Sequence, residues 1–272
     1  MVANPYSLEG KLVLVTGAGT GIGRGIAIEV ARMGADVVLH YASSAEGAVS
    51  AVAEIQSMGR RALALGGDLT QVSECRRVVD DAAAFLGGLD GVVSNAGVTN
   101  VVKFMDVTEE HFDFIYHLNI RGEFFVAQQA VKHMLTRGRQ LTELYPDKPW
   151  AGASIVNVSS VHGFMGWPGH SVYAGTKGAI NAFSRELAVE LCPEHIRVNV
   201  IAPGTIEVPN YFKLYPGYNR DSGNKLVPWG RVGLPEDVGH LAVYLLSDAS
   251  EFMTGHVVYF DGGLTAKMAI PD

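Results

Sequence analysis

A tyrosine and a lysine four positions apart are the residues in this sequence best suited to move a proton. Tyr173 and Lys177 fall within a stretch that favours a helix, and side chains four residues apart lie on the same helical face. A positive charge held beside a phenol favours the ionised form of the phenol. A phenol placed in this way can take a proton from an alcohol or return one to a carbonyl oxygen.

A glycine-rich segment near the start of the chain is a second functional signal. Its glycines follow a short apolar run and precede a helical stretch. In this setting glycines allow backbone N–H groups to approach a pyrophosphate at the positive end of a helix. A tight strand-to-helix turn without a ligand is the alternative. The candidate cofactor-binding residues of this segment are Gly17, Thr20, Gly21, Ile22 and Gly23.

With a nicotinamide dinucleotide bound, the tyrosine would act as the general acid or base of a hydride transfer. An unperturbed phenol has a pKa of about 10, and reaching a pKa of about 7 requires about 4 kcal/mol. One ammonium about 4 Å away supplies about 4 kcal/mol at an effective dielectric of about 20. We therefore expect Lys177 to lower the pKa of Tyr173 toward neutrality, assisted by the positive charge of the oxidised nicotinamide.

The end of the second expected strand bears on the choice between NADP and NAD. An acidic residue about 20 positions after the glycines commonly binds the ribose 2′-hydroxyl of NAD, but residues 40–44 read His-Tyr-Ala-Ser-Ser. No carboxylate there would repel a 2′-phosphate, so Tyr41, Ser43 and Ser44 favour NADP, with NAD left open. No Arg or Lys lies in this loop to anchor the phosphate, and the serines also suit a helix N-cap.

Alternating short apolar runs and amphipathic stretches must position these residues. The expected strands are residues 11–16, 35–40, 61–66, 89–94, 154–159, 196–202 and 256–260. The expected helices are residues 22–33, 45–58, 72–85, 109–135, 172–191 and 235–247. This alternation predicts an α/β protein of the Rossmann type, with a doubly wound, seven-stranded parallel sheet flanked by helices.

Length and composition favour one domain across residues 1–272. The 272 residues are 48% hydrophobic, which suits one large core, and no linker or internal repeat divides them. Residues 136–152 are polar and punctuated by Gly and Pro, so we interpret them as a surface excursion. Residues 207–230 combine Pro and Gly with several aromatic residues, a composition that suits a substrate lid.

Charge and cysteine content exclude several classes of function. The formal net charge is −7 and no run of Lys or Arg is present, so nucleic acid is not an expected partner. Cys75 and Cys192 are the only cysteines and form no CxxC motif, which argues against a disulfide framework and a cysteine metal site. No leader pattern and no apolar stretch of about 20 residues is found. We expect a cytoplasmic protein that does not span a membrane, with no bound metal.

A series of short motifs runs through the chain: Thr16-Gly17-x3-Gly21-x-Gly23, Asp68-Leu69, Asn95-Ala96-Gly97, Asn119, Ser160, Tyr173-x3-Lys177, Pro203-Gly204 and Asp261-Gly262-Gly263. In this order the chain resembles the short-chain dehydrogenase/reductase family over nearly its whole length. Ser160 matches rather than Ser159, because the family's serine precedes its tyrosine by thirteen positions. Two positions depart from the family pattern, since Ser94 stands where Asn is more common and Val208 where Thr is.

The resemblance implies roles for the matching residues. It makes Asn119, Ser160, Tyr173 and Lys177 a catalytic tetrad, in which Ser160 orients the substrate oxygen and Asn119 fixes a water that relays protons to Lys177. It places Asp68 and Leu69 at the adenine, Asn95, Ala96 and Gly97 beside the cofactor, and Pro203, Gly204 and Ile206 at the carboxamide end. Within the family, the motifs look most like glucose 1-dehydrogenases and, more broadly, 3-oxoacyl-carrier-protein reductases. A homotetramer is implied by the same resemblance.

The substrate is the least determined feature of the sequence. His162, Trp167, Glu207 and Tyr211 flank the reactive positions and could bind a sugar or polyol, which favours an aldose 1-dehydrogenase. The alternative is a reductase of a hydrophobic ketone or 3-oxoacyl substrate, because the same segments are rich in aromatic residues. A nucleotide-binding protein without turnover is a further alternative, against which the complete tetrad argues. A sugar-nucleotide epimerase of the extended branch is disfavoured by the glycine spacing.

Overall fold

Seven parallel strands form the centre of the structure, a computed structural model that describes residues 4–147, 150–215 and 217–268. The strands are β1 (Leu12–Val15), β2 (Asp36–Tyr41), β3 (Ala62–Gly66), β4 (Gly91–Ser94), β5 (Ala153–Val158), β6 (Ile196–Pro203) and β7 (Val257–Phe260). Their order in the sheet is β3-β2-β1-β4-β5-β6-β7. The predicted doubly wound parallel sheet is confirmed. The strand order reverses between β1 and β4, and at such a point this fold opens a crevice for ligands.

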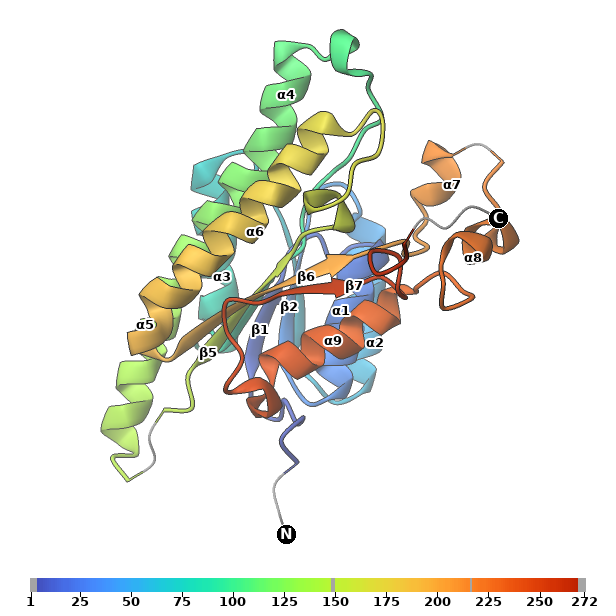
Figure 1. Cartoon of the computed structure of the whole chain (residues 1–272). Helices are drawn as coiled ribbons and strands as arrows, with labels where there is room; N and C mark the ends of the chain where they lie inside the picture. Colours follow the sequence, from blue (N-terminus) through green and yellow to red (C-terminus); the bar gives the residue numbers. More distant parts are fainter. Residues whose placement is uncertain (1–3, 148–149, 216, 269–272) are drawn as a thin grey trace.

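Helices cover both faces of the sheet (Figure 1). One layer contains α1 (Gly21–Arg32), α2 (Ala45–Ser57) and α9 (Pro235–Leu246), and the other contains α3 (Val72–Leu86), α5 (Glu123–Leu144) and α6 (Ser171–Leu191). The central strands β1 and β5 are buried along their whole length, which explains why β1 is a continuous apolar run rather than an alternating one. Among the described residues, no helix is long and apolar enough to cross a bilayer.

The helix expected at 109–135 is interrupted and extends further than predicted. It begins as α4 (Glu109–Tyr116), widens into a π-helical segment (His117–Gly122) and continues as α5 to Leu144. The interpretation of 136–152 as an irregular excursion is therefore wrong for its first half. A Cβ on Gly138 would lie 2.6 Å from the Trp150 ring, so this glycine in a helix is explained by the close packing of the indole. Residues 148–149 lie outside the described residues.

The segment expected to form a lid contains two short helices rather than an irregular loop. They are α7 (Tyr211–Leu214) and α8 (Arg220–Leu226), which lie together at one side of the molecule (Figure 1). Asn219 caps α8 by accepting a hydrogen bond from the Ser222 backbone N–H at 2.9 Å. Pro216, within this segment, and the apolar end of the chain at 269–272 lie outside the described residues.

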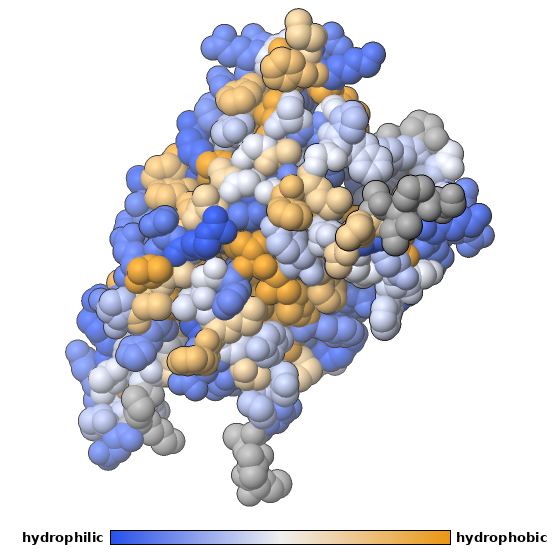
Figure 2. All heavy atoms as spheres, in the orientation of Figure 1, coloured by the Kyte–Doolittle hydropathy of each residue, from blue (hydrophilic) through white to orange (hydrophobic). Residues whose placement is uncertain are grey.

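The edge strand β7 is the least covered strand of the sheet. Its residues are only half-buried, and Tyr259 is exposed and lies 5.4 Å from the ring of Phe164 between centroids. Figure 2 shows apolar residues gathered in the middle of this face, where β7 crosses it in Figure 1. An uncovered edge strand can pair with another chain.

Candidate active site

The glycine segment forms a tight turn between β1 and α1. Gly17 and Gly21 have positive φ angles of 64° and 55°, a backbone conformation that residues with a Cβ rarely adopt. A Cβ on Gly17 would lie 2.9 Å from the Ala96 Cα, and one on Gly23 would lie 2.4 Å from the Gly17 carbonyl oxygen. Side chains here would fill the cradle in front of the α1 N-terminus, so the turn fits a pyrophosphate.

Hydrogen bonds from the end of β4 hold this turn in place. The Asn95 side chain donates from Nδ2 to the carbonyls of Thr16 at 3.0 Å and Gly17 at 3.2 Å. In return, the Thr16 hydroxyl accepts from the backbone N–H groups of Asn95 and Ala96, both at 3.0 Å. The structure therefore brings Asn95 and Ala96 against the glycine turn, as the resemblance implied.

His40, which was not among the predicted site residues, supports the turn from the other side. Its Nδ1 accepts the Gly17 backbone N–H at 3.2 Å, and its Nε2 lies 3.0 Å from the Gly67 carbonyl oxygen. These two contacts require a neutral ring with the proton on Nε2. Burial lowers the pKa of His40, which favours the same neutral form. A histidine at the end of a strand carries no sequence signal for this role.

The loop after β2 places the residues that were expected to discriminate between NADP and NAD. Ser44 occupies the N-cap position of α2, but its side chain makes no capping hydrogen bond, so its hydroxyl is not used for that purpose. The Tyr41 ring packs against Gly66 at the end of β3. Arg77 reaches the same place and donates to the Gly66 carbonyl at 2.7 Å, but Glu74 and Asp81 already pair with its guanidinium.

The remaining predicted cofactor residues border the same edge of the sheet. Asp68 accepts hydrogen bonds from the Thr70 backbone and hydroxyl at 2.9 and 2.8 Å, while Leu69 is buried. The Gly204 backbone N–H donates to the Phe260 carbonyl, which fixes Pro203 and Gly204 at the end of β6. Ile206 is buried and pairs with Gly233. A Cβ on Gly21 would lie 3.2 Å from the Val208 side chain, so the glycine turn and the start of the 207–230 segment are neighbours.

The four predicted catalytic residues converge beside β5. The Ser160 hydroxyl accepts the His162 backbone N–H at 3.2 Å and lies close enough to the Tyr173 phenol to lower its pKa. Lys177 is buried, donates to the Val158 carbonyl at 2.7 Å, and places Nζ 5.6 Å from the centre of the Tyr173 ring. A Cβ on Gly97 would lie 3.8 Å from this Nζ. The amine, phenol and hydroxyl therefore share one small region.

Asn119 belongs to the π-helical segment, and its side chain is fully used. Its Oδ1 accepts the Val98 backbone N–H at 2.9 Å, while Nδ2 donates to the Val98 carbonyl at 2.9 Å and to the Thr176 hydroxyl at 3.2 Å. A π-helical turn is frequent at functional sites because it redirects side chains locally. Here it ties the loop after β4 to the residue that precedes Lys177.

The expectation that Lys177 brings the phenol close to neutrality is not met in the structure. Burial raises the pKa of Tyr173 to about 12, and the hydrogen bond from Ser160 offsets only part of this rise. Burial also lowers the pKa of Lys177, which weakens the charge on which the expectation depended. At neutral pH Tyr173 is therefore a protonated phenol, which is suited to donate a proton.

Aromatic rings surround the phenol. The rings of His162 and His170 lie 4.8 Å apart, and their centroids are 5.5 and 6.4 Å from that of Tyr173. His162 Nδ1 is buried and has no hydrogen-bond partner among the described residues. Tyr215 contributes to the raised pKa of Tyr173, and Tyr173 in turn contributes to the raised pKa of Tyr211, so both tyrosines lie near the phenol. Trp167, also expected here, is 58% exposed on the β5–α6 loop.

Glu207 does not present a free carboxylate to a substrate. Arg220 forms an ion pair with it, and the Tyr218 hydroxyl donates to it at 3.1 Å. The sequence predicted a polar pocket that contains His162 and Glu207. That prediction is wrong for Glu207. The ion pair holds α8 to the start of the 207–230 segment, and the separation of the two residues along the chain hid this pairing from the sequence.

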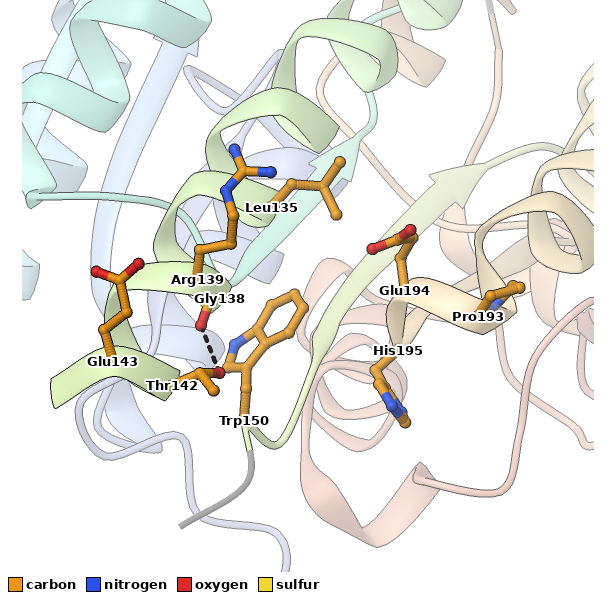
Figure 3. Close-up of a pocket in the computed structure, with 9 residues that line it drawn as sticks. All are labelled: Leu135, Gly138, Arg139, Thr142, Glu143, Trp150, Pro193, Glu194 and His195. Carbon is orange, nitrogen blue, oxygen red and sulfur yellow. Dashed lines mark hydrogen bonds between the residues drawn. The ribbon is translucent and has the colours of Figure 1, made fainter. Parts of the chain in front are cut away.

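One hollow of the described surface lies away from these residues. A cavity of about 370 Å³ lies between α5 and the residues that precede β5 and β6 (Figure 3). Leu135, Trp150 and Glu194 face one another across it. Because Tyr173 follows the carboxyl end of β5, this cavity is at the opposite edge of the sheet.

A nucleotide-binding turn and a phenol–amine pair at the carboxyl edge of a parallel sheet define a nicotinamide-dependent oxidoreductase. Residues 17–265 match the family profile described as enoyl-(acyl carrier protein) reductase. The short chain dehydrogenase mdpC of Emericella nidulans is 39% identical over 270 residues, which cover 95% of this chain and 97% of that protein. The chain belongs to the short-chain dehydrogenase/reductase family and is an NAD(P)-dependent enzyme of that family.

Further relatives indicate which members of the family this chain is similar to. The hydroxynaphthalene reductase-like protein Arp2 of Metarhizium guizhouense is 41% identical over 273 residues, 95% of this chain and 96% of its own. A short-chain type dehydrogenase/reductase from Mycobacterium marinum has a TM-score of 0.86 at 33% identity, covering 97% of this chain and 98% of its own. A proposed 2-deoxy-D-gluconate 3-dehydrogenase from Agrobacterium tumefaciens, with bound NADP, has a TM-score of 0.84 at 31% identity, covering 97% and 100%. A particular closeness to glucose dehydrogenases is not seen.

Proposed function

We propose that this enzyme reduces an aromatic ketone that carries a hydroxyl group on its ring system, with NADPH as the hydride donor. The observation that carries the proposal is the pair of imidazole rings beside Tyr173, with the buried, unpartnered His162 Nδ1 among them. A phenolic hydroxyl on the substrate would give this nitrogen a hydrogen-bond partner. The neighbouring tyrosines offer flat apolar faces to a planar ring.

The protonation state of Tyr173 supports reduction rather than oxidation. When a carbonyl is reduced, its oxygen must receive a proton as the carbon receives the hydride. Tyr173, with a pKa raised to about 12, is protonated at neutral pH and can supply that proton. Ser160 would hold the carbonyl oxygen, and the buried ammonium of Lys177 would stabilise the phenolate that remains.

The names of the relatives also favour reduction of a carbonyl over oxidation of an alcohol. Arp2 is named as a hydroxynaphthalene reductase-like protein, so we carry an aromatic substrate class over to this chain as part of the proposal. The aldose dehydrogenase, our first expectation from sequence, has less support because Glu207 is engaged by Arg220 and Tyr218. It stays as the second candidate, since one structural neighbour is named as a proposed sugar-acid dehydrogenase.

NADP remains the proposed cofactor, with NAD possible. Support comes from the loop after β2, where Ser44 makes no side-chain cap and no carboxylate stands in the way of a 2′-phosphate. The glycine turn would hold the pyrophosphate, while Pro203, Gly204 and Ile206 would border the nicotinamide end. The cofactor supplies the hydride, and the chain's own residues orient the ketone and deliver the proton.

A matched substrate panel tests the proposal. Purified enzyme is assayed for NADPH oxidation with a bicyclic aromatic ketone bearing a phenolic hydroxyl and with the same ketone lacking that hydroxyl, and for NADP⁺ reduction with a set of aldoses. We expect turnover with both ketones and a preference in kcat/KM for the hydroxylated one, which His162→Phe abolishes. Turnover with aldoses and none with either ketone would contradict the proposal.

The other sequence expectations remain proposals of the same enzyme. Residues 207–230 would close over the substrate, and exposed β7 together with α5 and α6 would contribute to a homotetramer. A cytoplasmic location, with small-molecule substrates and neither nucleic acid nor membrane as partner, is consistent with the acidic net charge of −7. Sedimentation of the purified protein would test the tetramer directly.

A further inference from the structure

Two serines follow one another at the end of β5, and the proposed chemistry uses the second of them. Ser160 lies close to the Tyr173 phenol, whereas Ser159, which is 4% exposed, has so far been given no role. The Ser159 hydroxyl donates to the backbone carbonyl of Lys177 at 2.9 Å. The first serine therefore contacts the catalytic lysine, and it does so through the lysine's main chain.

Lys177 is held at both of its ends by two adjacent residues. Its Nζ donates to the Val158 carbonyl at 2.7 Å, and its own carbonyl accepts from the Ser159 hydroxyl. A lysine side chain is a flexible stem that loses much rotamer entropy when it is fixed in place. Because its backbone and its ammonium are bound at neighbouring points, the stem of this lysine has little freedom to move.

The residues that hold Lys177 belong to rigid parts of the molecule. The Ser159 backbone N–H donates to the Ile201 carbonyl of β6 at 2.8 Å, and Val158 pairs with Ile201 in the sheet register. The loop after β5 adds close packing, since a Cβ on Gly163 would lie 3.0 Å from the Lys177 carbonyl oxygen. The sheet and the loop therefore fix the position of this peptide group together.

The turn of α6 from Tyr173 to Lys177, called here the catalytic turn, moves as one unit. Within it the Thr176 hydroxyl donates to the Tyr173 carbonyl at 2.7 Å and accepts from the Asn119 side chain at 3.2 Å. A shift of α6 along β5 would therefore carry the phenol away from Ser160 and the ammonium away from the Val158 carbonyl together. The Ser159 hydroxyl opposes such a shift.

We propose that Ser159 is a positioning residue, whose hydroxyl fixes the catalytic turn of α6 against the end of β5. It sets Tyr173 relative to Ser160 and Lys177 relative to Val158. Ser159 acts through Lys177 and touches neither substrate nor cofactor. The inference rests on the proposed ketone reduction.

Ser154 provides a matched control in the same part of the sheet. It lies in β5, is 1% exposed, and donates its hydroxyl to the Leu245 carbonyl of α9 at 2.8 Å. Each of the two serines ties the sheet to a helix through one buried hydrogen bond from a hydroxyl to a backbone carbonyl. Ser154 reaches the helical layer on the opposite face, so its loss should cost stability without moving the catalytic turn.

The first experiment compares Ser159→Ala with Ser154→Ala. Each variant loses one buried hydrogen bond, so both should unfold at a lower urea concentration than the parent. In the ketone assay Ser159→Ala should lose about 10- to 100-fold in kcat, because small displacements of reacting groups are costly. Its KM for the ketone should change by less than about twofold, and Ser154→Ala should keep the parent's kcat. Ser159→Thr, which retains the hydroxyl, should recover most of the loss.

The alkaline limb of the rate profile provides a second measurement. Burial lowers the pKa of Lys177, and the hydrogen bond to Val158 favours its charged form. If α6 can shift, this bond weakens, so the alkaline limb of kcat in Ser159→Ala should move down by up to about one pH unit. Ser154→Ala should have the parent's limb. The titratable groups around the catalytic turn are retained in every variant: Glu123 on α5, Tyr173 on α6, and His162 and His170 before it.

A merely structural role for Ser159 would give a different result. Ser159→Ala would then lose stability as Ser154→Ala does, but it would keep the parent's kcat and pH profile, and the inference would fail while the proposed function stands. Should Ser159→Ala not fold, Ser159→Cys takes its place in both comparisons, because a thiol fills the site but is a weak donor.

A failure of the proposed function can be told apart from a failure of this inference. If no ketone is reduced, the proposed function fails, and crystal structures of the parent and of Ser159→Ala decide the inference without a substrate. We expect the Lys177 Nζ to leave the Val158 carbonyl in the variant. An Nζ that stays within hydrogen-bonding distance, with Tyr173 unmoved relative to Ser160, would overturn the inference.

Discussion

The two sides of the catalytic crevice differ in how their buried polar groups are satisfied. On the glycine-turn side, Thr16, His40 and Asn95 are tied into one hydrogen-bonded network. There, Ser94 Oγ at the end of β4 is a buried polar atom without a partner among the described residues, whereas on the catalytic side Glu123, His162 and Asn181 each have one. A satisfied network fixes a shape before any ligand arrives, whereas unpartnered groups retain the capacity to bind a substrate or hold a proton. The first side is built for recognition of a constant ligand and the second for chemistry.

The largest expected effect comes from the catalytic side. Tyr173→Phe removes the proton donor while keeping the ring, so kcat should fall by about 10²–10⁴-fold, the usual contribution of general acid catalysis. NADPH binding, followed by tryptophan fluorescence, should be unchanged, because the glycine turn does not depend on this hydroxyl. If Tyr173→Phe retained the parent's turnover, Tyr173 would not be the proton donor, and the contrast between the two sides would not hold.

The next effect belongs to the glycine turn. Asn95→Ala removes the donor to the Thr16 and Gly17 carbonyls and leaves buried acceptors unpaired, which costs about 1–3 kcal/mol. We expect lower stability in urea unfolding and weaker NADPH binding, with kcat at saturating cofactor nearly unchanged. A loss confined to kcat, with normal binding, would show that the turn is not an independent recognition unit.

His40 should make the recognition side sensitive to acid. Burial lowers its pKa in the folded chain, so below its ordinary pKa of about 6.5 the unfolded chain binds the proton more readily. The stabilising contribution is therefore present above about pH 6.5 and is lost as the pH falls further. His40→Gln, which can still accept from Gly17 but does not titrate, should lose less stability than the parent between neutral and mildly acidic pH. Equal losses in urea unfolding at each pH would contradict this role.

The smallest effect is expected at the 207–230 segment. Arg220→Ala breaks the ion pair with Glu207, but the arginine is exposed, and exposed pairs contribute little. We expect a rise in KM of no more than about threefold for the ketone, no change in NADPH binding, and somewhat faster proteolysis between residues 207 and 230. If Arg220→Ala oxidised aldoses, the released Glu207 carboxylate would be able to bind a sugar, as the sequence first suggested.

Several features followed from local sequence because their causes are local. Continuous apolar runs predict buried parallel strands, and the seven strands were predicted in type and in their succession along the chain. The extent of α5 was not predicted, because Gly138 and the polar residues after it resemble a loop until Trp150 packs back against the helix. The π-helical segment at Asn119 was missed for a related reason, since a helix of that composition shows no break.

The sequence by itself determined the family, the glycine turn and the spacing of Ser160, Tyr173 and Lys177, because these depend on short motifs and on the period of a helix. Only the tertiary structure decided the protonation state of those groups. Burial, which no spacing reveals, raises the pKa of Tyr173 and lowers that of Lys177. Long-range folding likewise joined Arg220 to Glu207 and His40 to Gly17, and thereby decided which polar groups remain free to act on a substrate.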